Sequence, residues 1–202
     1  MLVLPILEYC SVLWAPLDVE NTQKLDEIQW MFIRKVNYSA EKDYWKRLKD
    51  LKLYSLERHR DRYRIIYVWK VLEGHVPNVN SKISSKTHVR LGRMCEIPTV
   101  KNGKQAKIVN ASFPVHGQRL FNALPKCLRE LTGVKLDTFK CALDKHLKRV
   151  PDEPQLPGYT AYRRTSSNSL IQMAKFAENL PGCSFSLESK ELLDTAGSTS
   201  SR

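Results

Sequence analysis

Residues 55–74, SLERHRDRYRIIYVWKVLEG, predict the clearest helix in the sequence and decide the fold class. Ser55 has the side chain of an N-cap residue, and Gly74 suits the position that follows a helix C-terminus. The apolar residues at helical spacing predict a buried stripe, which consists of Leu56, Tyr63, Ile66, Tyr67 and Val71. Four arginines at alternate positions are expected to fan round the polar side of the first two turns: Arg58, Arg60, Arg62 and Arg64.

The segments on either side predict further helices. Residues 18–36 and 136–150 carry apolar residues at helical spacing, and Asp137 is the expected cap of the second segment. A shorter helix is expected at residues 41–53, and helical character resumes at residues 112–131 until Pro125 breaks it. The predicted buried faces are Leu25, Ile28, Phe32 and Val36 in the first segment, and Phe139, Leu143, Leu147 and Val150 in the second.

One stretch has β character. In MCEIPTVKNGKQAKIV, residues 94–109, two β-prone runs flank Asn102-Gly103, a strong short-range signal for a hairpin. Pro98 restricts the first run to a sheet edge. The expected fold is therefore mainly α, an irregular helical bundle with one small β-hairpin around residues 94–109 and a partly disordered C-terminal tail. Residues 1–150 are expected to form the helical body, and residues 151–202 a Pro-rich linker, a short helix and the disordered tail.

The charge of the chain is unevenly distributed. The formal net charge is +12, and residues 1–150 hold 28 Lys and Arg against 15 Asp and Glu, whereas residues 151–202 hold 5 against 6. A basic body indicates an acidic partner, most often a nucleic acid, with an anionic membrane or an acidic protein as alternatives. Solvated Lys-rich helices explain part of the same excess without any partner.

The sequence lacks the motifs of common enzyme classes. It contains no Asp-Asp dipeptide, P-loop, G-x-S-x-G or G-x-G-x-x-G sequence, so we expect no catalytic residue and no cofactor. Asp26-Glu27 and Asp152-Glu153 are interpreted as solvated surface. Cys141 and His146 are five residues apart with no second pair nearby, and no Cys-x-x-Cys occurs among the five cysteines, so we expect no metal site and reduced thiols.

The N-terminal stretch LPILEYCSVLW, residues 4–14, is apolar but does not match a signal peptide. No Lys or Arg precedes it, and Glu8 interrupts it. The sequence also has no apolar run of about 20 residues, the length that a membrane-spanning helix requires. We therefore expect an intracellular protein, cytoplasmic or nuclear, with no membrane partner.

Basic residues concentrate between positions 82 and 107, where seven Lys and Arg face the single acid Glu96. Such a cluster can meet phosphates without reading base sequence, although a solvated loop explains it equally well. A second candidate patch lies on the helix of residues 55–74. The predicted nucleic-acid-binding residues are Arg90, Arg93, Lys101, Lys104, Lys107, Arg60 and Arg64. Core or interface packing explains the tryptophans Trp14, Trp30, Trp45 and Trp69 better than base stacking does.

Several landmarks in order resemble one known region. LPILEYCSVLW, KLDEIQWMFIRKV, YWKRLKDLKLYSLERHRDRYRIIYVWKVLEG, FPVHGQRLFNALP and LDTFKCALDKHL are similar to successive segments that follow the polymerase core in jockey-like non-LTR (LINE-type) retrotransposon reverse transcriptases. The similarity covers about residues 2–150. The sequence departs from the family pattern at Trp30-Met31, where the family often has Arg-Arg, at Tyr54, where Pro is frequent, and at Leu4, where a basic residue is common.

The resemblance implies a thumb-like or post-thumb helical role without catalysis. The family's polymerase core, with its Asp-Asp box and metal site, corresponds to sequence upstream of Met1, so no catalytic residue carries over. The implied partners are RNA or DNA, bound weakly and without sequence preference, and the polymerase core of the parent element. A helical protein-interaction or structural module with no nucleic-acid role is the alternative.

Overall fold

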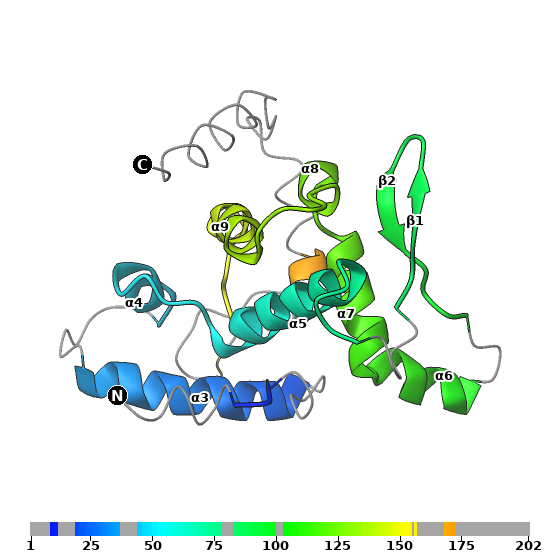
Figure 1. The fold of residues 1–202 in the computed structure, drawn as a ribbon. Coiled ribbons are helices and arrows are strands. Elements are labelled where there is room, and N and C mark those ends of the chain that lie inside the picture. Colours follow the sequence, from blue (N-terminus) through cyan, green and yellow to red (C-terminus); the bar gives the residue numbers. More distant parts are fainter. Residues whose placement is uncertain are drawn as a thin grey trace, which may run out of the picture.

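The computed structural model describes residues 9–11, 19–36, 44–77, 83–99, 103–154, 156 and 168–172, which are coloured in Figure 1. Within these residues the chain is mainly helical and has one two-stranded antiparallel hairpin, so the predicted fold class is confirmed. The predicted disordered tail lies outside the described residues. The elements are α3 (Val19–Val36), α4 (Tyr44–Asp50), α5 (Leu56–Leu72), β1 (Ser85–His88), β2 (Gly92–Cys95), α6 (Gly103–Ala111), α7 (Phe113–Asn122), α8 (Lys126–Arg129) and α9 (Leu136–Leu147).

Helix α5 occupies the centre of the arrangement and begins and ends as predicted (Figure 1). Ser55 has an extended backbone, and its Oγ accepts a hydrogen bond from the Arg58 backbone N–H at 3.1 Å. Gly74 follows the helix with a φ of +75°, a conformation that side chains other than glycine rarely adopt. Both predicted ends of this helix are therefore confirmed.

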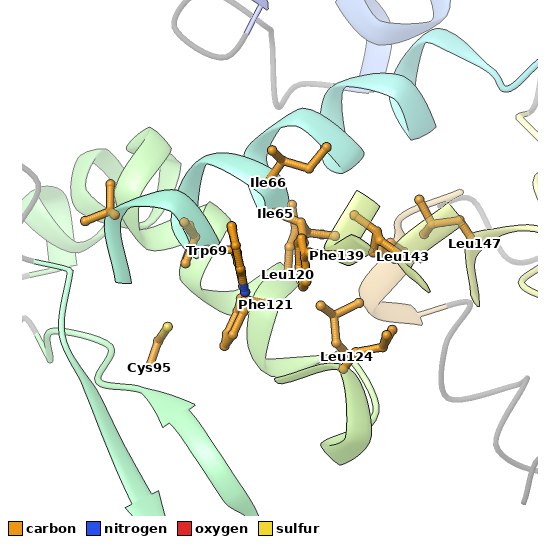
Figure 2. Close-up of a cluster of buried hydrophobic side chains, with 14 of the residues drawn as sticks. Ile65, Ile66, Trp69, Cys95, Leu120, Phe121, Leu124, Phe139, Leu143 and Leu147 are labelled. Atoms are coloured by element: carbon orange, nitrogen blue, oxygen red, sulfur yellow. The ribbon is translucent and has the colours of Figure 1, made fainter. Parts of the chain in front are cut away.

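The main hydrophobic core forms where α5 packs against α7 and α9 (Figure 2). The Trp69 ring stacks on Phe139, with 4.6 Å between ring centroids and 10° between ring planes. The Trp69 Nε1–H donates to the backbone oxygen of Leu131 at 2.9 Å, so the polar atom of the ring is satisfied inside the core. All four residues predicted for the buried face of the last helix are buried, namely Phe139, Leu143, Leu147 and Val150.

The N-terminus of α9 differs from the prediction. Lys135 is the N-cap residue, and Asp137 is the second residue of the helix, with its carboxylate 3.0 Å from the Lys140 ammonium. An acidic side chain in the first turn still interacts favourably with the positive end of the helix dipole. Asp137 therefore stabilises the helix without capping it.

Close approach of α5 and α7 depends on a glycine. A Cβ added to Gly117 would lie 2.9 Å from the Cγ2 of Val68 and 3.7 Å from the backbone oxygen of Arg64. No ordinary van der Waals contact between carbons is that short. The absence of a side chain at Gly117 thus sets how near the two helices lie.

A smaller core joins α3 to α4. Trp30 and Ile33 of α3 are buried with Tyr44 and Leu48 of α4 and with Leu156. The guanidinium of the buried Arg47 lies 5.0 Å from the centroid of the Trp30 ring, a cation–π contact. Core packing is therefore confirmed for Trp30 and Trp69, and Trp45, which is partly buried, donates to the backbone oxygen of Pro154 at 2.6 Å.

The predicted buried stripe of α3 is wrong at Ile28, which is 38% exposed, and the buried face carries Asp26 and Gln29 instead. The hydrogen bonds of Gln29 explain why the buried face of α3 differs from the predicted one. Its Oε1 accepts from the Tyr44 hydroxyl at 3.0 Å and from the Leu56 backbone N–H at 3.1 Å, and its Nε2 donates to the Tyr54 oxygen at 2.9 Å. Because these bonds fix Gln29 toward α5, Ile28 faces outward.

The hairpin lies earlier in the chain than predicted. Strands β1 and β2 pair from Ser85↔Cys95 to His88↔Gly92, so the prediction of a hairpin around residues 94–109 is wrong. Gly92 has a φ of +69° and follows the turn at residues 89–91, as in hairpins with three-residue loops. Gly103 begins helix α6, because Lys, Gln and Ala after it favour a helix more strongly than Asn102-Gly103 favours a turn.

Part of the predicted linker packs on the helical body. Asp152 accepts hydrogen bonds from the Ser55 backbone N–H and from the Ser55 hydroxyl, each at 2.8 Å, and from the Asn168 amide at 2.8 Å. Arg58, fully buried in α5, donates to the backbone oxygen of Pro151 at 2.7 Å. The interpretation of Asp152 as solvated surface is therefore wrong, because its carboxylate fastens this stretch to the start of α5.

Candidate nucleic-acid interface

Arg60 and Arg64 do not form a surface patch. Only 3% of Arg60 and 4% of Arg64 is exposed, so the prediction that they lie on the polar side of α5 is wrong. The guanidinium of Arg64 lies 3.4 Å from the carboxylate of Asp61, and His116 of α7 lies 3.7 Å from the same carboxylate. The Asp61 carboxylate takes the place of water for Arg64, whereas the Nη2 of Arg60 has no hydrogen-bond partner among the described residues.

The same buried region holds two carboxyl groups with altered acidity. Burial raises the pKa of Asp26 from 3.8 to about 7, against the opposing effect of the positive charge of Arg60. Burial, reinforced by the negative charge of Asp61, raises the pKa of Glu57 from 4.5 to about 8. Asp26 is thus neither solvated nor fully ionised at neutral pH, contrary to its interpretation as surface. Asp26 is not accessible to a large ligand, and its protonation affects the stability of the fold; Glu57 is half-buried.

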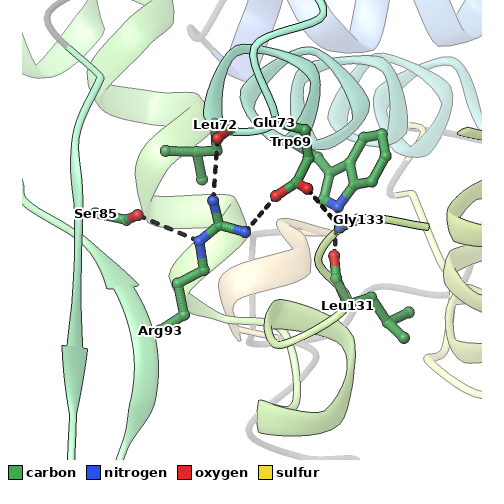
Figure 3. Close-up of polar contacts among 7 residues, drawn as sticks. All are labelled: Trp69, Leu72, Glu73, Ser85, Arg93, Leu131 and Gly133. Atoms are coloured by element: carbon green, nitrogen blue, oxygen red, sulfur yellow. Dashed lines mark hydrogen bonds and ion pairs between the residues drawn. The ribbon is translucent and has the colours of Figure 1, made fainter. Parts of the chain in front are cut away.

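Arg93 is a structural residue (Figure 3). Its guanidinium donates to the Glu73 carboxylate at 2.6 Å, to the Leu72 backbone oxygen at 3.2 Å and to the Ser85 hydroxyl at 3.2 Å. Glu73 in turn accepts from the Gly133 backbone N–H at 2.8 Å. Because these contacts use most of its N–H donors, Arg93 holds the hairpin against α5 and has few donors free for a phosphate.

The other four predicted nucleic-acid-binding residues lie in the hairpin turn, on α6 or outside the described residues. Arg90 lies in the turn between β1 and β2 and is exposed, so it stays a candidate for phosphate contact. Lys104 and Lys107 lie on α6, one turn apart, and their side chains are outside the described part of the structure. Lys101 is outside it altogether. The structure therefore does not gather the seven predicted residues into one surface.

A different group of cations surrounds a cleft that the sequence analysis missed. The cleft has a volume of about 700 Å³ and lies between the C-terminal ends of α4 and α9. Its apolar floor includes Leu48, Leu53, Leu147 and Val150. Four exposed basic residues line it, two from each side: Lys49 and Lys52, and Lys148 and Arg149.

Local structure holds these cations at the rim of the cleft. Lys49 lies in the last turn of α4, and Lys52, with a φ of 54°, is at the bend that ends this helix. Lys148 is the C-cap residue of α9. Among the described residues, no ion pair joins Lys49, Lys52 or Lys148 to a carboxylate. The positive charge of all three remains available to an anion.

Three acids line the same cleft: Asp144, Asp152 and Glu153. Asp144 accepts two hydrogen bonds from the Arg62 guanidinium, at 2.6 and 2.8 Å. Asp152 is held by Ser55 and Asn168, and the third acid is Glu153. Burial, followed by the nearby charge of Asp144, raises the pKa of Tyr54, so its hydroxyl stays neutral. Counting Arg62, the positive charges around the cleft exceed the negative ones.

The sequence signal for this cleft was weak. Lys49 and Lys52 are separated from Lys148 and Arg149 by about a hundred positions, and each pair looks like the basic end of an amphipathic helix. The two pairs come together where the segments that follow α4 and α9 meet, with Ser55 hydrogen-bonded to Asp152. The basic residues between positions 82 and 107, in contrast, are contiguous in sequence, and a local pattern is enough to predict them as a cluster.

Neither a metal site nor a membrane span is found in the described part of the chain. No group of three or more His, Cys, Asp or Glu side chains there could hold a metal ion. Burial, with smaller effects of Arg58 and Arg149, lowers the pKa of His146 to about 4. None of the described helices is both long enough and apolar enough to cross a lipid bilayer.

Comparison with known proteins adds no relative. No protein-family model, no curated protein and no solved structure matches the chain.

Proposed function

We propose that the chain binds RNA or DNA without reading its sequence, through phosphate contacts to the cations around the α4–α9 cleft. The observation that supports it most is the convergence of Lys49, Lys52, Lys148 and Arg149 on one cleft, three of them with no carboxylate partner among the described residues. Phosphate contacts of this kind supply the sequence-independent part of nucleic-acid affinity.

The charge of the described surface supports the same proposal. Thirteen exposed Lys and Arg stand against six exposed Asp and Glu in the part of the chain that the structure describes. Burial does not add to this excess, because five arginines but only two aspartates are buried among the described residues. The exposed residues of the described part still carry seven more positive than negative charges.

We further propose that the chain is a non-catalytic C-terminal segment of a retrotransposon reverse transcriptase. The ordered landmarks over about residues 2–150 support this origin. In such a protein the segment would hold template or primer beside the polymerase core.

A helical protein-interaction module is the second candidate, and the outer face of α3 favours it. Ile28 is 38% exposed and Met31 53% exposed on that face. Clustered apolar exposure of this kind is typical of a surface that packs on another protein. A polymerase core is the partner that the proposed origin supplies.

Binding of labelled single-stranded RNA and DNA of several unrelated sequences, followed by fluorescence anisotropy at about 50 mM salt, tests the proposal. We expect binding to every sequence with similar affinity. K49Q/K148Q should weaken it, whereas K35Q/K135Q, which removes the same charge from exposed positions away from the cleft, should weaken it much less. Equal losses in the two variants would show that the cleft is not the site. Strong self-association with no nucleic-acid binding would favour the interaction module.

A further inference from the structure

The tip of the hairpin exposes aliphatic side chains that contribute nothing to the core. Val89 is 98% exposed and Leu91 is 56% exposed, with the exposed Arg90 between them. The turn is the free end of the hairpin (Figure 1), although Gly92, which follows it, packs against α8. An exposed aliphatic pair costs solvation free energy that packing does not recover.

The base of the hairpin is held by three helices. Asn122 of α7 accepts from the Cys95 backbone N–H at 2.7 Å and donates to the Cys95 oxygen at 2.9 Å. Arg129 of α8 donates to the Arg93 backbone oxygen at 2.6 Å.

The third helix is α5, where Arg93 and Glu73 form an ion pair at 2.6 Å whose side chains are 13% and 10% exposed (Figure 3). Burying such a pair costs desolvation free energy, and the pair holds the hairpin in one orientation relative to α5. The result is a rigidly oriented hairpin with an apolar end.

The charge around the tip favours an anionic partner, and the proposed nucleic-acid binding makes a nucleic acid the partner that fits it. Residues 85–92 contain Lys86, His88 and Arg90 and no carboxylate. Glu96 pairs with Lys86, and Glu130 of α8 lies against Gly92, next to the turn, where it pairs with Lys126. An aliphatic side chain flanked by cations has the composition of wedges that proteins insert between base pairs.

We propose that Val89 and Leu91 insert into the base stack at the end of a nucleic-acid duplex while Arg90 contacts the adjacent phosphate. This inference rests on the proposed nucleic-acid binding and adds a separate action to it. Unstacking a base step costs free energy, and the cost is lowest where a duplex meets a single strand, so the junction is the favoured place. The hairpin then marks or holds open the end of the duplex.

A duplex with a single-stranded overhang and 2-aminopurine at the junction base pair tests this action, because 2-aminopurine fluoresces more strongly when it is unstacked. With saturating protein we expect a rise in fluorescence. V89S/L91S should lose the rise while its affinity for the duplex changes little, because the phosphate contacts remain. I108S, a matched change at a 74% exposed aliphatic residue on α6, should keep the rise.

The outcomes separate the two proposals. Binding of the wild-type protein without a rise in fluorescence, or an equal rise in V89S/L91S, would overturn the wedge and leave the nucleic-acid binding intact. Failure of the wild-type protein to bind any nucleic acid at about 50 mM salt would overturn the proposed function itself, and the wedge with it. If V89S/L91S reduces self-association in sedimentation and leaves the fluorescence unchanged, the tip contacts protein and the inference is wrong. Since the substituted side chains lie on the surface, these variants are expected to fold.

Discussion

Replacement of Asp26 by Asn should remove a large part of the pH dependence of stability. Asp26 is 2% exposed, and its Oδ1 has no hydrogen-bond partner in the described structure. Its pKa is about 7 in the folded chain against an ordinary 3.8, so the folded state binds the proton more tightly than the unfolded state does. The contribution of the protonated carboxyl group to stability is complete below pH 3.8 and is lost as the pH rises through about 7.

The size of the effect follows from the two pKa values. The whole difference corresponds to about 4 kcal/mol, of which about 2 to 3 kcal/mol is lost between pH 5 and pH 8. Glu57 acts with the same sign, since its pKa is raised to about 8, but it is only half-buried and its share is smaller. The free energy of unfolding of D26N should therefore depend less on pH than that of the wild type, and Glu57 should account for part of the dependence that remains.

Urea unfolding followed by tryptophan fluorescence at pH 5, 6, 7 and 8 gives the required free energies of unfolding. We expect D26N to match the wild type near pH 5 and to be more stable than the wild type at pH 8. E27Q is the matched control, because Glu27 is the next residue of α3 and is exposed. Parallel profiles of D26N and the wild type, or an E27Q profile as flat as that of D26N, would refute the assignment to Asp26.

Two further substitutions test the packing. G117A should lower the free energy of unfolding in urea by about 1 to 3 kcal/mol, because the added methyl group overlaps Val68 at 2.9 Å. G103A is the control, and it should be nearly neutral in the same titration because its Cβ position faces open space. R93M should loosen the hairpin, which amide hydrogen exchange of the strand residues would detect as faster exchange, whereas R90M should leave the exchange rates unchanged. Retained protection in R93M would contradict the role of the Arg93 contacts.

Local sequence signals predicted the ends of α5 and the buried face of α9 correctly. These features depend on residues within one helix: a serine before the first turn, a glycine after the last, and apolar residues at helical spacing. The buried face of α3 was misplaced for the opposite reason. Gln29 turns this helix by hydrogen bonds to Tyr44 and Leu56, which are 15 and 27 positions away.

The candidate site was harder to predict than the fold, because burial of charge depends on partners from several elements. A helical wheel places Arg64 on the solvent side of α5, yet in the structure it is buried beside the carboxylate of Asp61. The hairpin was placed at Asn102-Gly103, whereas the turn ends at Gly92. The cleft arises from residues 48–54 and 144–153, whose proximity no local pattern reveals.

The salt dependence of nucleic-acid binding tests the central claim most directly. Affinity for a single strand should fall linearly on a plot of log K against log salt, with a slope of about −0.7 for each phosphate neutralised. A variant with Lys49, Lys52, Lys148 and Arg149 all changed to Gln should have a slope smaller in magnitude by about 2 to 3, because up to four phosphate contacts are lost. An unchanged slope in this variant, or no binding by the wild-type chain at about 50 mM salt, would contradict the account.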